Sequence, residues 1–196
     1  MILSGRKSTE HQGLLFDPEI LEGQHGVVRN VIGDLAERLT ATLVGGVRHK
    51  TDCTADYCPD VSAGTNYFES KAVGRSRTAF VYGGRLLKDR EFAATRKLTY
   101  IIWHHRVLTT EAKSVAELEN MALCGLVACY AVPFCEVDRI CSAMTPDRLN
   151  SKYGGSATRP TYGSGYRINL KLLKRWEVYG WADKLTTAGI VTSANC

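Results

Sequence analysis

The hydrophobic period of the chain changes near residue 46, and this change constrains the fold more than any other feature. Between Val28 and Leu43, apolar residues recur at the spacing of an amphipathic helix, and Gly45-Gly46 gives a stop signal. From about His49 to Val107, apolar residues instead form short runs rich in β-branched and aromatic side chains. A helix with one apolar face followed by strands predicts an α/β fold, with the helix packed on a sheet.

The strand-like region divides into four runs. We expect strands over Thr51–Val61, Asn66–Val73, Thr78–Tyr82 and Leu98–Val107, with a short helix or helical turn between the third and the fourth. The residues Ala63-Gly64-Thr65 predict a turn that returns the first strand antiparallel to the second. The chain then reads as helix, three strands, short helix, strand.

The second half of the chain reads mainly as helices. Ser114 and Glu117 form a capping box before a long apolar stretch, and Pro133 and Thr145-Pro146 are helix-start signals. Residues 151–167 are rich in Gly, Ser and Pro and predict a flexible basic loop, followed by an amphipathic stretch. We expect an N-terminal arm over residues 1–26, a core over 27–110, and a helical part of the same domain over 111–196.

Composition sets the class of protein. A chain of 196 residues with 44% hydrophobic content can bury one substantial core. No window approaches the roughly 18 apolar residues of a membrane span, so we expect a cytoplasmic protein without a membrane partner, or a virus-encoded protein acting inside a host cell. The seven cysteines are odd in number and contain no C-x2-C pair, which favours reduced thiols over disulfides or a metal cluster.

The net charge of +5 is unevenly distributed. Between Lys71 and Arg106 there are nine Lys or Arg residues and two acidic residues. Between Arg148 and Arg175 there are seven Lys or Arg residues and no acidic residue. Such an asymmetry is typical of a face that binds a polyanion, because each contacted phosphate needs a cation. The alternative is a generally basic, solvated surface.

Acidic and basic residues gather around the first strands. Pro59-Asp60 is followed, after eight residues, by Glu69-Ser70-Lys71. On a strand Glu69 and Lys71 share one face, and the predicted turn allows Asp60 to join them. Two carboxylates and the backbone carbonyl of Ser70 are oxygen ligands of the kind that Mg²⁺ prefers. The Lys71 ammonium would position and polarise a water and offset negative charge in the transition state.

These two motifs, on successive strands after an amphipathic helix, resemble the PD-(D/E)XK nuclease superfamily, which includes restriction endonucleases, Holliday junction resolvases and phage nucleases. The resemblance covers about residues 27–110 and implies a restriction-endonuclease-like αβββαβ core with a mixed sheet. It implies Mg²⁺-dependent cleavage of DNA, with Mn²⁺ as a substitute, Asp60 and Glu69 as metal ligands and Lys71 as the catalytic lysine. We expect an endonuclease, acting as a homodimer because one metal centre cuts one strand of a duplex.

Three further residues are candidates for this site. Asp56 lies four residues before Asp60, on the same face of an extended strand, and is an alternative or additional metal ligand. Many relatives carry a glutamate on the first helix, but Glu37 lies nearly opposite the apolar stripe and is expected to be a surface residue. His104 and His105 point to opposite sides of a strand, and His104 is either a proton shuttle or a structural histidine.

Basic residues outside the motif are candidates for contacting DNA. Arg75 and Arg77 follow the catalytic strand, while Arg159 and Arg167 lie with tyrosines and glycines in the predicted loop. A disordered linker is the alternative for that loop. Three functions therefore remain open: a metal-dependent DNA endonuclease, a DNA-binding protein with a degenerate nuclease fold, and a structural protein with a chance match.

Overall fold

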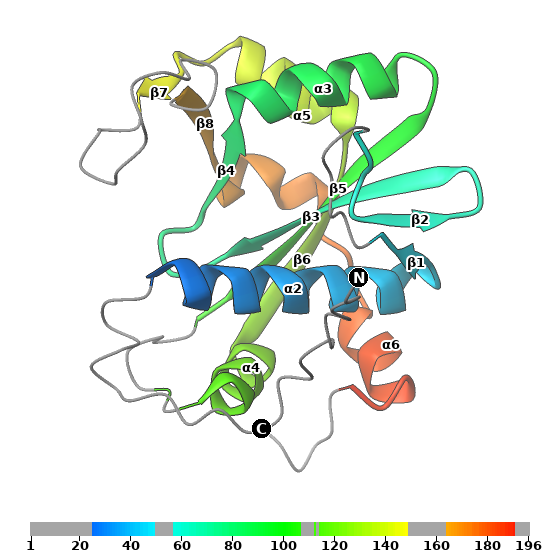
Figure 1. The fold of residues 1–196 in the computed structure, drawn as a ribbon, viewed down its shortest axis with the longest axis vertical. Coiled ribbons are helices and arrows are strands. Elements are labelled where there is room, and N and C mark those ends of the chain that lie inside the picture. Colours follow the sequence, from blue (N-terminus) through cyan, green and yellow to red (C-terminus); the bar gives the residue numbers. More distant parts are fainter. Residues whose placement is uncertain (1–24, 50–56, 107–111, 113, 149–163, 191–196) are drawn as a thin grey trace, which may run out of the picture.

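The computed structural model describes residues 25–49, 57–106, 112, 114–148 and 164–190, which form a layered α/β arrangement (Figure 1). The elements of the first half are α2 (His25–Val44), β1 (Val47–Arg48), β2 (Val61–Ala63), β3 (Asn66–Val73), β4 (Thr78–Tyr82), α3 (Gly83–Ala93) and β5 (Lys97–His105). Those of the second half are α4 (Val115–Cys124), β6 (Leu126–Pro133), α5 (Phe134–Ser142), β7 (Asp147–Arg148), β8 (Ser164–Asn169), the 3-10 helix η2 (Leu170–Trp176) and α6 (Trp181–Thr187).

A mixed five-stranded sheet organises the fold. Its strand order is β1-β2-β3-β5-β6, with β3 parallel to β5 and the other neighbours antiparallel. A second sheet of three antiparallel strands has the order β4-β8-β7. The expected α/β class with a mixed sheet is therefore confirmed, and the strand β4 leaves the first sheet to pair in the second.

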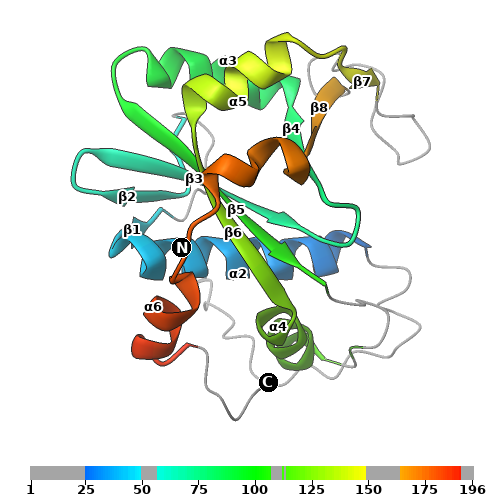
Figure 2. The same ribbon diagram turned by 180° about the vertical axis from the view of Figure 1, so that it is seen from behind.

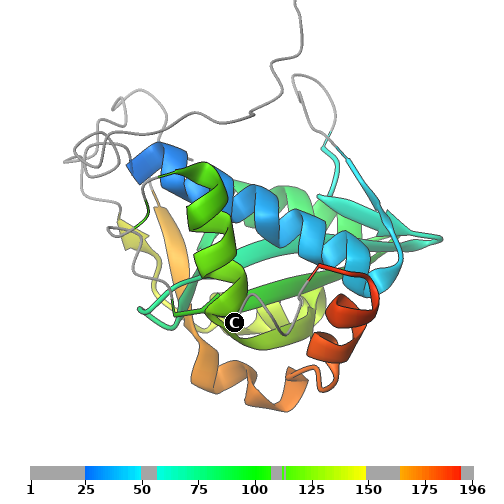
Figure 3. The ribbon, with the colours of Figure 1, turned by 90° about the horizontal axis from the view of Figure 1, so that it is seen from below.

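Helices cover both faces of the five-stranded sheet (Figures 1 and 2). On one face, α2, α4 and α6 pack on a cluster that includes Leu39, Trp103 and Leu185. Seen from that side, α2 and α4 lie across the strands and α6 lies beside them (Figure 3). On the other face, α3, α5, η2 and the second sheet pack on a cluster that includes Leu86 and Leu173. The sheet is thus buried from both sides, and β5, whose residues 100–105 are all buried, lies in its interior between β3 and β6.

The helix α2 ends where the sequence predicts. Gly45 has a φ of 63°, a left-handed conformation that glycine adopts without a steric penalty. The Gly45 N–H donates to the Thr42 carbonyl (3.3 Å) and the Gly46 N–H to the Ala41 carbonyl (2.8 Å). This bonding pattern satisfies the last carbonyls of a helix and turns the chain into β1.

The predicted hairpin is present, but it is shorter than expected. Ala63 pairs with Asn66 across a two-residue loop in which Gly64 has a φ of 59°. The strand β3 has the expected bounds, whereas β2 begins at Val61. Residues 57–60 lie outside any strand, so the expected strand over Thr51–Val61 is wrong for these four residues, and only Val61 lies in a strand. The start of that run lies outside the described residues.

The prediction that the second half of the chain is mainly helical is wrong in three places. Residues 126–132, expected to extend a helix, belong to β6 (Leu126–Pro133), because the chain turns at Gly125 and residues 126 and 128–133 pair with β5. Thr145-Pro146 leads into the strand β7 rather than starting a helix. Residues 164–167, expected in a flexible loop, belong to β8, while residues 151–163 of that loop lie outside the described residues.

Two sequence expectations concern membranes and cysteines. In the part of the chain that the structure describes, no helix combines the length and the apolarity needed to cross a bilayer. Among the described residues, Cys58, Cys124, Cys129, Cys135 and Cys141 take part in no disulfide, and their reduced state stays a prediction.

Candidate functional site

Asp60, Glu69 and Lys71, which we call the candidate site, lie where β2 and β3 pair. Asp60 immediately precedes Val61, and Val61 pairs with Phe68, so the chain direction places Asp60 across from Glu69. On the other side of β3, Glu69 pairs with Tyr100 of β5. The antiparallel hairpin thus brings together residues that the two sequence motifs contribute separately.

The Asp60 carboxyl group is held in place by the backbone of β3. Its Oδ2 accepts a hydrogen bond of 2.7 Å from the Ser70 N–H. Burial, together with the negative charge of Glu69, raises the pKa of Asp60 to about 7, although Lys71 and the Ser70 N–H act in the opposite direction. Two carboxylates close enough to repel each other in a buried place favour the binding of a cation.

Glu69 is buried and paired on both of its carboxylate oxygens. Lys71 Nζ lies 2.5 Å from Glu69 Oε1, and Arg85 pairs with Oε2. Burial acts to lower the pKa of Lys71, but the carboxylates of Glu69 and Asp60 outweigh it, and the pKa is raised. Lys71 therefore stays protonated at neutral pH and acts as a cation, not as a base.

Two residues of α3 join the site, and the sequence analysis missed both. Arg85 pairs with Glu69 and, over 3.3 Å, with Asp89 one helical turn later. Asp89 has no exposed surface, and its carboxylate accepts hydrogen bonds from the hydroxyls of Tyr57 and Tyr100. The spacing of Arg85 and Asp89 by four residues on a predicted helix was a visible signal of an ion pair.

Ser70 points away from the candidate site and fastens β3 to α2. Its hydroxyl donates to Thr40 Oγ1 (2.6 Å), and the Trp103 indole N–H donates to the same oxygen (3.0 Å). The Ser70 hydroxyl also lies 3.4 Å from the Ala36 carbonyl, so two groups of α2 bind this buried side chain. Ser70 thus fixes the strand that carries Glu69 and Lys71, while its carbonyl as a metal ligand stays a prediction.

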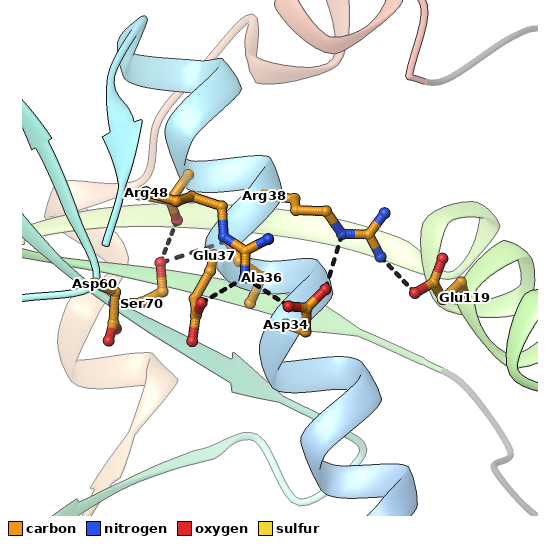
Figure 4. Close-up of polar contacts among 9 residues, drawn as sticks. Asp34, Ala36, Glu37, Arg38, Arg48, Asp60, Ser70 and Glu119 are labelled. Atoms are coloured by element: carbon orange, nitrogen blue, oxygen red, sulfur yellow. Dashed lines mark hydrogen bonds and ion pairs between the residues drawn. The ribbon is translucent and has the colours of Figure 1, made fainter. Parts of the chain in front are cut away.

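Glu37 lies at the margin of the candidate site (Figure 4). Its side chain is 30% exposed, its carboxylate pairs with Arg48 Nη2 at 2.7 Å, and Arg48 also pairs with Asp34. Figure 4 shows Glu37 and Arg48 beside Asp60 and Ser70. After burial and Glu69, the charge of Glu37 makes a smaller contribution to the raised pKa of Asp60. Glu37 is therefore half-buried and ion-paired, near Asp60 but separated from Lys71 by the strand.

His104 does not join the candidate site. It pairs with Val73, two residues beyond the pairing of Lys71 with Ile102, which is about 7 Å farther along the strands. It is buried, and burial followed by the charges of Arg77 and Arg106 lowers its pKa. Neutral imidazole so placed favours the structural interpretation over a proton shuttle.

The predicted DNA contacts lie on different elements. Arg75 and Arg77 are exposed in the turn between β3 and β4, and Arg75 follows Lys71 by four residues, about 13 Å of extended chain. Arg167 is exposed on β8, with its guanidinium 5.7 Å from the centre of the Phe80 ring. Arg159 lies outside the described residues, as does the alternative metal ligand Asp56.

The donor atoms fit a magnesium ion held by few protein ligands. Within the described ranges, no group of three His, Cys, Asp or Glu residues is arranged to hold a metal. Asp60 and Glu69 supply two carboxylates, and Mg²⁺ is commonly held by one or two carboxylates with water and substrate oxygens around it. Asp60 and Glu69 would hold such an ion once a cation partner of Glu69 moves aside.

Comparisons of the chain with protein families, with curated proteins and with solved structures find no match. A function must therefore be argued from the side chains that β2, β3 and α3 bring together. Those side chains are two facing carboxylates, a protonated lysine and an anchored arginine, next to a basic turn.

Proposed function

We propose that the protein is a Mg²⁺-dependent deoxyribonuclease of the PD-(D/E)XK type that cuts DNA as an endonuclease. The observation that carries this proposal is the approach of Asp60 to Glu69 and Lys71, which is close enough for both charges to act on the Asp60 carboxyl group. Paired carboxylates beside an ammonium are the groups that phosphodiester hydrolysis with a hard cation needs.

The order of elements supports the proposal. The helix α2, the strands β1, β2 and β3, the helix α3 and the strand β5 follow one another, and β3 is parallel to β5. We infer that these six elements are the αβββαβ core that the sequence resemblance implies and that β4, which was expected as its third strand, is an insertion after β3. Asp60, expected at the end of a strand, lies directly before β2, while Glu69 and Lys71 lie on β3, the strand on which they were expected.

The residues of the site have distinct roles in this proposal. A bound Mg²⁺ would neutralise charge that develops on the phosphoryl oxygens. The protonated Lys71 adds a second positive charge and orients the attacking water, while Glu69 holds the ammonium in place. The Ser70 N–H fixes Asp60 Oδ2. Because the pKa of Asp60 is raised to about 7, its carboxylate becomes available as pH rises through 7, and cleavage should increase over that range.

Cleavage of supercoiled plasmid with Mg²⁺ tests the proposal. Glu69→Ala and Lys71→Ala should lower the rate at least about 100-fold, because each removes charge that the transition state needs. Lys88→Ala removes an exposed cation of α3 that makes none of the site's contacts and serves as the control. Undiminished cutting by either site variant, with the control active, would refute the assignment.

DNA and a second copy of the chain are the proposed partners. Arg75 and Arg77 would contact phosphates beside the cut. The double variant Arg75→Glu/Arg77→Glu should therefore weaken binding to DNA of every sequence. The slope of log K against log salt should also fall by the equivalent of about two released counterions. Lys88→Glu, which reverses one exposed cation of α3, is the control for a charge reversal away from this turn. Two copies would present one site to each strand of a duplex, and sedimentation of the protein on DNA with Ca²⁺ tests this. Cytoplasmic action in a host cell is part of the same proposal.

A DNA-binding protein without catalysis is the second candidate function. Both oxygens of Glu69 are engaged by Lys71 and Arg85, as expected if the acid has a structural role. In that case the wild-type protein binds DNA in a salt-sensitive way and leaves plasmids intact in both Mg²⁺ and Mn²⁺. Cleavage that needs Glu69 excludes this alternative.

A further inference from the structure

Arg85 is the residue of α3 that reaches the candidate site. Its guanidinium pairs with Glu69 Oε2, lies 3.3 Å from Asp89, and sits over the Tyr57 ring at 4.3 Å from the ring centre. The side chain keeps 27% of its surface exposed. It therefore has one side fastened inside the protein and another open to a ligand.

Asp89, the carboxylate that holds Arg85 in place, has no access to solvent. Asp89 is fully buried and accepts hydrogen bonds from the Tyr57 and Tyr100 hydroxyls, in addition to its ion pair with Arg85. Burying a carboxylate is unfavourable unless cations and donors surround it. Asp89 itself cannot reach a substrate, so its function is to hold the arginine.

Glu69 can release Arg85 more easily than it can release Lys71. A divalent cation that binds Glu69 must displace one of the two cations now paired with it. Arg85 retains Asp89 as an ion-pair partner when it leaves Glu69, whereas Lys71 would keep the charge of Asp60, a carboxylate that the metal itself needs, and the Tyr100 ring at 5.8 Å. Loss of the Arg85 contact thus leaves no buried charge unpaired.

The charge of the site changes sign when a divalent cation binds. With Asp60 ionised, the carboxylates of Asp60, Glu69 and Asp89 exceed the cations Lys71 and Arg85 by one negative charge. A divalent cation converts this into one positive charge, which complements the single negative charge of a phosphodiester. Without Arg85 the loaded site would be neutral, so the arginine supplies the charge that attracts the substrate.

We propose that Arg85 takes the place of the metal ion at Glu69 in the metal-free protein and that, once a divalent cation binds there, it contacts the phosphate to be cut. This inference rests on the proposed nuclease function. The planar guanidinium presents parallel N–H donors that fit two phosphate oxygens, and the anchor at Asp89 and Tyr57 keeps it near the site. Arg85 is thus a catalytic residue that also competes with the metal.

Calorimetric titration with Ca²⁺ in the absence of DNA tests the competition. Arg85→Gln removes the competing charge and should bind the cation about tenfold more tightly than wild type, the scale of one charge-assisted hydrogen bond. Arg85→Lys keeps the charge and should stay near wild type. Lys88→Gln, on the exposed surface of the same helix, controls for the loss of one positive charge. A purely structural arginine predicts unchanged or weaker cation binding in Arg85→Gln, and that result overturns the inference.

DNA binding in Ca²⁺ and cleavage in Mg²⁺ test the phosphate contact. Arg85→Gln should bind DNA at least tenfold more weakly, with one counterion fewer in its salt dependence, and cut about 100-fold more slowly. Arg85→Lys should recover binding but only part of the rate, because it lacks the planar donors. If Arg85→Gln cuts at the wild-type rate while Lys71→Ala is inactive, this inference fails and the nuclease function stands. If wild type never cuts DNA, the nuclease function fails, and the titration still decides whether Arg85 competes with a cation at Glu69.

Discussion

The raised pKa of Asp60 predicts that a single substitution stabilises the protein, and only above acidic pH. The pKa of this carboxyl group is about 7 in the folded protein and 3.8 in the ordinary reference state. Between these values the folded protein binds a proton that the unfolded chain has lost. The free energy of unfolding therefore falls as pH rises from about 4 to 7. Above pH 7, Asp60 is ionised in both states and no longer changes the free energy of unfolding with pH.

The size of the effect follows from the shift. One pKa unit corresponds to about 1.4 kcal/mol, so between pH 5 and pH 8 the ionisation of Asp60 removes about 3 kcal/mol from the free energy of unfolding. Asp60→Asn is neutral throughout, and its amide oxygen still accepts the Ser70 N–H. The variant should gain about 3 kcal/mol relative to wild type between those two pH values.

Urea denaturation at pH 5, 6.5 and 8, followed by tryptophan fluorescence, measures this difference. Asp183→Asn, which alters an exposed carboxylate on α6, is the control for the substitution itself. Mg²⁺ in tenfold excess over its dissociation constant should add about 1.4 kcal/mol to wild type at pH 8 and little to Asp60→Asn. A difference between Asp60→Asn and wild type that does not change with pH would refute the reasoning, since it would mean that Asp60 is not buried beside Glu69.

Two predictions concern the scaffold of the site. Thr40→Val keeps the shape of the side chain but removes the hydroxyl oxygen that accepts hydrogen bonds from the Trp103 indole N–H and the Ser70 hydroxyl. Because the indole N–H is buried, the variant should lose about 2 kcal/mol of the free energy of unfolding, as measured by urea denaturation. Thr40→Ser is the control that keeps the hydroxyl, and equal losses in both variants would contradict this account. Gly165→Ala in β8 places a methyl group against the Phe80 ring and 2.7 Å from the carbonyl of residue 81, and should cost about 1–3 kcal/mol in the same assay. An unchanged midpoint would show that β4 and β8 are not as closely paired as described.

The strand β3 and the hairpin turn before it could be predicted because their signals are local, whereas the strand expected to precede that turn was wrong in its bounds. The β3 run contains strand-type residues and lies between turn residues, and Gly64 supplies the left-handed conformation of the hairpin loop. The side-chain alternation then places Glu69 and Lys71 on one face. The convergence of Asp60 with them depends only on that hairpin, so it too was within reach of the sequence.

The second half was predicted less well because its signals are ambiguous. The run from Leu126 to Pro133 continues the apolar character of the preceding helix, and a short continuous apolar run does not distinguish a helix from a buried strand. Pairing with β5 decides the outcome, and no local signal reports it.

Arg85 shows a second kind of limit. Its ion pair with Asp89 was visible as a helical spacing, but the burial of Asp89 depends on Tyr57 and Tyr100, which lie on other parts of the chain. Contacts between distant segments are what the sequence left unspecified.

The pairing of β4 with β8 has a consequence for how the chain reaches its folded state. Thr78 pairs with Asn169 and Tyr82 with Gly165, so the second sheet joins segments that are synthesised far apart in time. Contacts of such long sequence separation slow folding, because a large loop must close before they form. Until β8 leaves the ribosome, β4 exposes an unpaired edge directly after the strand that carries Glu69 and Lys71, and a chain interrupted before residue 164 should aggregate through that edge.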